Sequence, residues 1–111
     1  MFKPGALATK KHGLKVAIKE METNAISSVF VVDEKRRLQG IITIDDAIEG
    51  IKNNKSMLDI LKHDYFTIDE ETYVQELIPK AIETKYPIAV VNEDDKLVGI
   101  IVRVSVLSGL V

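Results

Sequence analysis

VFVVDEKRRLQGII at residues 29–42 and IAVVNEDDKLVGII at residues 88–101 are two copies of one pattern, 59 positions apart. Seven of the 14 aligned pairs are identical. Each copy is an apolar run, a polar turn and a second apolar run, which predicts a β-hairpin. The apolar runs do not alternate with polar residues, so both faces of each hairpin are expected to be buried. We therefore predict helices on one face and the twin hairpin on the other.

Apolar residues at helical spacing flank both hairpins and predict a helix before and after each. They are Leu14, Ala17, Ile18, Met21 and Ala25, then Ile44, Ala47, Ile48 and Ile51 in the first copy, and Val74, Leu77, Ile78, Ala81 and Ile82, then Val104, Leu107 and Val111 in the second. Pro79 interrupts one of these helices and is expected to kink it or end it early, at a cost of roughly 3 kcal/mol. Residues 6–9 and 65–68 are expected to form short leading strands, and residues 56–61 a short connecting helix.

The predicted fold is α/β (α+β), with a β-α-β-β-α unit written twice. The first copy spans residues 1–55 and the second spans residues 56–111. Neither copy can bury its apolar faces alone, so the two are expected to pack as one pseudo-two-fold unit.

Composition narrows the class of protein. The chain has 111 residues, the size of one compact domain, and no apolar run approaches the ~20 residues that span a bilayer. It has no Cys, which fits a reducing cytoplasm and leaves no thiolate metal site. Residues 1–55 hold ten Lys and Arg against seven Asp and Glu, and the remaining residues hold five against ten. No strongly basic face is expected, so nucleic acid is not a predicted partner.

A candidate binding site lies in GIITIDD at residues 40–46, where a strand is expected to end and a helix to begin. Backbone N–H groups at such a helix start bind phosphate, Thr43 can add a hydroxyl, and the Asp46 carboxylate can accept hydrogen bonds from a ribose diol. Thr-x-x-Asp is equally a capping box, in which both side chains only satisfy backbone donors. The second copy has Val102 and Ser105 at these positions, so at most one such site is expected per chain.

Catalytic sets are not evident in the sequence. His12 and His63 lack metal-ligand spacing, and the Ser27-Ser28 pair has no nearby base. The Walker pattern Gly-x-x-x-x-Gly-Lys-Ser/Thr is missing. We therefore expect that the chain is not an enzyme and needs no cofactor or metal.

The duplicated unit, with its Val-Val-Asp, Leu-x-Gly-Ile-Ile and Thr-x-x-Asp motifs, resembles the tandem CBS domain pair, or Bateman module. The resemblance covers nearly the whole chain. It implies that Thr43 and Asp46 contact the phosphate and ribose of an adenine nucleotide, either AMP, ADP, ATP or cyclic di-AMP. Other positions that the resemblance places around the same cleft are Thr9, Lys10, Ser28, Tyr86, Pro87 and Arg103.

Residues 85–107 more specifically resemble the C-terminal region of the ATP-binding subunit of glycine betaine/proline osmoprotectant ABC importers. This resemblance implies an ATPase domain upstream in the same chain and a parent protein that is a transport ATPase. It also implies a homodimer through the CBS helices and contact with membrane-embedded transporter subunits at the inner face of the plasma membrane. The module would then sense ionic strength or a nucleotide and gate solute uptake.

Two alternatives remain open at this point. Instead of an importer module, the chain could be an adenine-nucleotide sensor from an unrelated host protein, or it could be a purely structural dimerisation module. In the second case Thr43 and Asp46 would only cap a helix.

Overall fold

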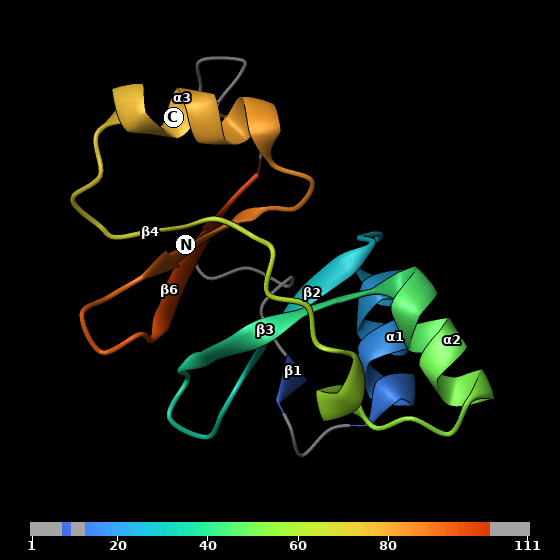
Figure 1. Cartoon of the computed structure of the whole chain (residues 1–111). Helices are drawn as coiled ribbons and strands as arrows, with labels where there is room; N and C mark the ends of the chain where they lie inside the picture. Colours follow the sequence, from blue (N-terminus) through green and yellow to red (C-terminus); the bar gives the residue numbers. More distant parts are fainter. Residues whose placement is uncertain (1–7, 10–12, 103–111) are drawn as a thin grey trace.

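The computed structural model describes residues 8–9 and 13–102 (Figure 1). Its elements, in chain order, are β1 (Ala8–Thr9), α1 (Leu14–Thr23), β2 (Ser28–Val32), β3 (Leu38–Thr43), α2 (Ile44–Lys52), the 3₁₀ helix η2 (Met57–Ile60), β4 (Thr67–Ile68), α3 (Val74–Glu83), β5 (Ile88–Val91) and β6 (Leu97–Ile101). The predicted hairpins, leading strands and short connecting helix are therefore present. The helix expected around Val104, Leu107 and Val111 lies outside the described residues.

The strands form two sheets of identical topology, β1-β2-β3 and β4-β5-β6. In each sheet the first pair of strands is parallel and the second is antiparallel. Val31 lies opposite Gly40 in the first hairpin, and Val90 lies opposite Gly99 in the second. These pairings are equivalent under the 59-residue offset, so the sequence repeat is a structural repeat.

The two hairpin turns are built in the same way. Oδ1 of Asp33 accepts hydrogen bonds from the N–H groups two and four positions later, at 2.9 and 2.8 Å. Oδ1 of Asn92 does the same at 2.9 and 3.0 Å. Each turn also places one residue in the left-handed region, Arg36 with φ 68° and Asp95 with φ 62°. An Asx side chain thus organises each turn.

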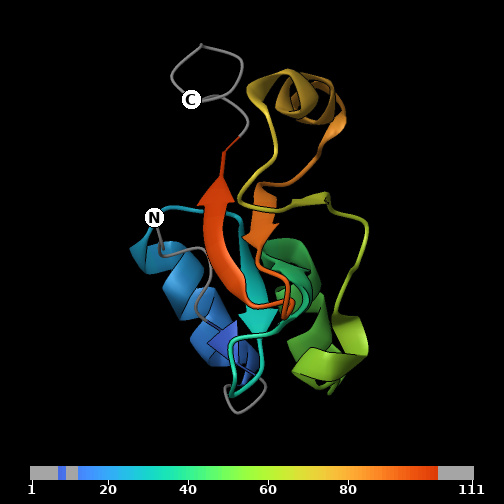
Figure 2. The same ribbon diagram turned by 90° about the vertical axis from the view of Figure 1, so that its left-hand side faces the viewer.

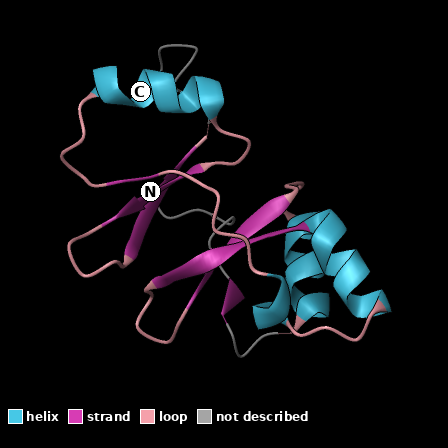
Figure 3. Ribbon diagram, viewed as in Figure 1, coloured by secondary structure: helices cyan, strands magenta, loops and turns pink. Residues whose placement is uncertain are grey.

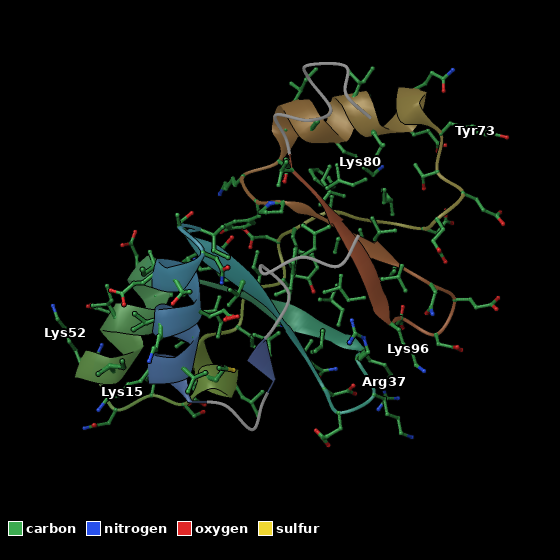
Figure 4. The ribbon with its side chains drawn as sticks, turned by 180° about the vertical axis from the view of Figure 1, so that it is seen from behind. Lys15, Arg37, Lys52, Tyr73, Lys80 and Lys96 are labelled. Carbon is green, nitrogen blue, oxygen red and sulfur yellow. The ribbon has the colours of Figure 1, made fainter. Side chains whose placement is uncertain are left out.

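The turns also join the two repeats. The N–H of Leu38 donates to the carbonyl of Asp95, and the N–H of Leu97 donates to the carbonyl of Arg36, both at 2.9 Å. Arg37 and Lys96, which form an isolated bridge, lie side by side in Figure 4. Because these bonds exchange equivalent positions, they relate the repeats by a pseudo-two-fold axis.

The core has three apolar layers. Helices lie on the outside, and the two sheets face each other (Figures 2 and 3). Successive side chains of β2 alternate between layers, so Val29 and Val31 face the helices while Phe30 and Val32 face the other sheet. The helix side of the first sheet buries Leu14, Ala17, Met21, Val29, Val31, Ile42, Ala47 and Met57; the space between the sheets buries Phe30, Val32, Ile41, Ala89 and Leu97; the α3 side buries Ile68, Leu77, Ala81 and Ile88. The expected burial of both hairpin faces is confirmed.

One helix prediction is wrong, and of the kink or early end expected at Pro79 the early end does not occur. Ala25, expected on a helix face, lies beyond the end of α1 with φ 55° and is exposed. Pro79 does not end its helix, because α3 continues through it to Glu83. Leu77 and Ala81, buried on either side of Pro79, hold the helix on its sheet. Burial of these side chains outweighs the single helical hydrogen bond that proline removes.

Candidate functional site

A cleft of about 860 Å³ lies between the repeats. The segment before β2, the β3–α2 junction, the segment before β5 and the end of β6 line it. Its hydroxyl-bearing side chains are Ser27, Ser28, Thr43 and Tyr86, its ionic side chains are Asp45 and Lys85, and its apolar side chains include Ile26, Phe30, Ile44, Pro87, Ile100 and Val102. Apolar and aromatic walls with a few polar groups are typical of small-molecule sites.

The structure brings four of the eight predicted site residues together in this cleft. These four are Thr43, Ser28, Tyr86 and Pro87. Asp46 is in the first turn of α2 but is not among the lining residues, whereas its neighbour Asp45 is. Thr9 is in β1, where it pairs with Val32. Lys10 and Arg103 lie outside the described residues.

Two backbone N–H groups at the start of α2 find acceptors within the protein. Thr43 is the N-cap, and its Oγ1 accepts a hydrogen bond from the N–H of Asp46 at 3.2 Å. The N–H of Ile44 donates to the carbonyl of Ser27 at 2.9 Å. Half of the predicted capping box is therefore formed, since the Asp46 carboxylate does not return to the Thr43 N–H. The Thr43 hydroxyl can still donate its proton to a ligand.

The Asp46 carboxylate meets Lys62 instead. Lys62 Nζ lies 3.0 Å from Asp46 Oδ2, an atom that is buried and has no partner in hydrogen-bond geometry among the described residues, so the contact is an ion pair. Contact with this carboxylate, and then its charge, raises the pKa of Lys62 above the usual 10.5, and Tyr86 adds a smaller effect. No repeat motif marks Lys62, so sequence reasoning missed it.

The segment that carries Lys62 also explains the motif glycine of the first repeat. Lys62 and Ile41 exchange two backbone hydrogen bonds of 2.9 Å, which add this segment to the edge of β3. A Cβ on Gly40 would lie 3.0 Å from the Lys62 carbonyl oxygen and 3.1 Å from Leu61 Cβ. On Gly99 it would lie an ordinary 3.6 Å from Val90 Cβ. Among the described residues, a close approach requires the first of these two glycines and not the second.

Two further observations bear on function. Within residues 8–9 and 13–102, no three His, Cys, Asp or Glu side chains gather to hold a metal ion. Over the same residues, no helix combines the length and the apolar character needed to cross a membrane. His63 is exposed, and His12 lies outside the described residues.

The model of the CBS domain matches this sequence twice, at residues 8–53 and 58–111. The chain belongs to the CBS domain family. Together with the two matching sheets, this confirms both the resemblance and the fold class predicted from the sequence.

Curated relatives of this CBS pair are transport ATP-binding proteins. The glycine betaine transport ATP-binding protein OpuAA of Bacillus subtilis is 35% identical over 98 residues, which is 88% of this chain and 23% of the relative. The glycine betaine/carnitine transport ATP-binding protein GbuA of Listeria monocytogenes is 39% identical over 111 residues, 99% of this chain and 28% of the relative. The chain thus spans about a quarter of the length of these relatives.

Solved structures agree with the fold. Staphylococcus aureus OpuCA superposes with a TM-score of 0.88 at 26% identity, covering 99% of this chain and 94% of that chain. The CBS-pair protein CBSX2 of Arabidopsis thaliana superposes with a TM-score of 0.78 at 18% identity, covering 93% and 83%. The second likeness concerns the fold alone.

Proposed function

We propose that this chain is the regulatory CBS pair of the ATP-binding subunit of an osmoprotectant importer, and that it binds an adenine nucleotide in the cleft between its repeats to gate transport. The curated relatives, which are transport ATP-binding proteins, support the importer. Its partners would be an ATPase domain in the same chain and membrane-embedded transporter subunits at the inner face of the plasma membrane. The ATPase chemistry would belong to the parent subunit.

The observation that carries the nucleotide proposal is a cleft that residues of both repeats line. Tyr86 offers aromatic surface to a base, and Ser28 and Thr43 offer hydroxyls to a ribose or a phosphate. A ligand that contacts both repeats stabilises one arrangement of the two. The module would transmit that preference to the attached ATPase domain.

A homodimer through the CBS helices belongs to the same proposal. Val16, Ile48 and Ile51, on α1 and α2, are 50, 43 and 37% exposed. Lys15 of α1 and Lys52 of α2 project from the same two helices (Figure 4). Apolar side chains exposed together mark interaction surfaces. A two-fold pairing through this face would suit an importer with two ATPase subunits.

The test is a thermal-unfolding panel with AMP, ADP, ATP and cyclic di-AMP. A ligand bound only by the folded state at 100 times its Kd stabilises it by about 2.7 kcal/mol, so the midpoint should rise clearly. Tyr86→Ala should lose most of this shift relative to its own unliganded midpoint. Tyr73→Ala, which removes a tyrosine that is 73% exposed and outside the cleft, should keep it. A wild-type midpoint that none of the four nucleotides moves would contradict the nucleotide proposal.

Ionic strength is a second candidate signal, favoured by the Lys62–Asp46 ion pair. This pair ties the connection between the repeats to the start of α2, and the Lys62 side chain is 43% exposed. The Debye length falls from about 8 Å at physiological salt to about 3 Å at 1 M, so salt weakens such a contact. We expect the salt dependence of wild-type unfolding to be reduced in Lys62→Met. The same salt response in both proteins would remove this pair from the proposal.

A further inference from the structure

Two ionic side chains face the cleft, one from each repeat. Asp45 comes from the first turn of α2, and Lys85 comes from the segment before β5. Both are exposed, and within the described part of the chain they are the only ionic residues of the lining. Asp46, by contrast, is held by Lys62 outside the lining. The described charge of the cleft is therefore balanced, with one cation against one carboxylate.

The start of α2 has little more to offer an anion. Of its first N–H groups, that of Ile44 is used by Ser27 and that of Asp46 by Thr43. The Asp45 N–H is left without a partner in the described structure, and it lies beside the Asp45 carboxylate. Sites that cradle several phosphates use many backbone N–H groups and a cation together. Among the described residues, the start of α2 supplies one such N–H beside a negative charge, and the cleft lining supplies one lysine.

We propose that Asp45 and Lys85 make the cleft selective for a nucleotide with one phosphate group and exclude polyphosphates. Lys85 pairs with the single phosphate, and the Asp45 carboxylate repels the further charges of a di- or triphosphate. The proposal rests on the proposed function, since it assumes a nucleotide in this cleft. It makes Asp45, and not Asp46, the carboxylate that sets ligand charge.

The test is calorimetric titration of the whole chain with AMP and with ATP, without divalent cations, at about 0.1 M salt, where the Debye length is about 10 Å. Wild type should bind AMP about tenfold or more tightly than ATP, as expected for repulsion of extra charges at close range. Asp45→Asn should increase the affinity for ATP by roughly three- to tenfold and change the affinity for AMP little. Lys85→Gln should reduce the affinity for AMP by a similar factor.

Glu49→Gln is the matched control, because Glu49 is an exposed acid of the same helix α2 outside the cleft. It should leave both affinities within about twofold. Raising the salt to about 0.5 M should reduce the ratio of AMP affinity to ATP affinity in wild type but change it little in Asp45→Asn. A purely structural role of Asp45 would not produce this difference. Circular dichroism of each variant checks that it is folded.

Equal affinity of wild type for AMP and ATP, tighter ATP binding, or a ratio that Asp45→Asn leaves unchanged would each overturn the charge selectivity and leave the proposed function standing. If wild type binds neither AMP nor ATP, the charge selectivity fails. The proposed function fails with it only if ADP and cyclic di-AMP also leave the thermal-unfolding midpoint unchanged.

Discussion

Gly40→Ala probes the contact between the first hairpin and the segment that links the repeats. The new Cβ would lie 3.0 Å from the Lys62 carbonyl oxygen and 3.1 Å from Leu61 Cβ, closer than most real Cβ contacts. The carbonyl has little freedom to retreat, because it accepts a 2.9 Å hydrogen bond from the Ile41 N–H. The substitution must therefore push the segment away or strain the strand.

The expected cost follows from this geometry. Overpacking a tight site destabilises a protein by about 1–3 kcal/mol, and weakening the two Lys62–Ile41 hydrogen bonds adds about 1 kcal/mol. We expect a loss of about 2–4 kcal/mol for Gly40→Ala, which for a domain near this size lowers Tm by roughly 10–20 °C. Gly99→Ala is the matched control, since among the described residues its Cβ would meet Val90 alone, at an ordinary 3.6 Å. Replacing glycine there should be neutral or stabilise by up to about 1 kcal/mol.

The assay is urea unfolding followed by circular dichroism, with hydrogen exchange of the Lys62 amide as a local readout. That amide donates to the Ile41 carbonyl at 2.9 Å, so it should lose protection in Gly40→Ala and keep it in Gly99→Ala. If Gly40→Ala proved as stable as Gly99→Ala, with the Lys62 amide still protected, the linking segment would not be the reason for the motif glycine.

Three further predictions concern caps, charge and proline. Thr43→Ala should lower the free energy of unfolding by about 1 kcal/mol because it removes the N-cap of α2, and Thr43→Ser should recover most of this loss. Thermal unfolding measures the effect, and an unchanged midpoint in Thr43→Ala would contradict it. Burial raises the pKa of Asp33, but hydrogen bonds and the charge of Arg37 outweigh burial and hold it below the usual 3.8. The stabilisation from this carboxylate is therefore present above pH 3.8 and is lost as pH falls through the lowered pKa. Asp33→Asn keeps a side-chain oxygen acceptor like that of Asn92 in the other turn, but it has no charge. Its free energy of unfolding should therefore be lower than that of wild type at pH 6 and approach it at pH 2. A difference between the two proteins that stays constant from pH 6 to pH 2 would refute this. Pro79→Ala should restore a helical hydrogen bond in α3 and raise the unfolding free energy by up to about 3 kcal/mol in urea titrations, whereas a lower value would show that proline fits this helix better.

The candidate site was predicted in part. The resemblance to the CBS family located Ser28, Thr43, Tyr86 and Pro87, because these positions follow from the repeated hairpin and lie at the ends of its strands. It assigned the carboxylate role to Asp46. The ion pair with Lys62 lies outside the repeat pattern, so the sequence could not reveal it. The cleft position of Asp45 likewise depends on how α2 is turned against its sheet.

The architecture of the fold could be predicted from the sequence alone. Unbroken apolar runs around a polar turn specify a hairpin buried on both faces, and a second copy supplies the missing cover. Local patterns carry this information because strand and helix periods are properties of neighbouring residues. Only the tertiary structure decided that Pro79 stays within a helix, that Gly40 makes room for residues 61–62, and that Lys62 reaches Asp46. Each depends on the packing of segments distant in the chain, and burial and contact between such segments override local preferences.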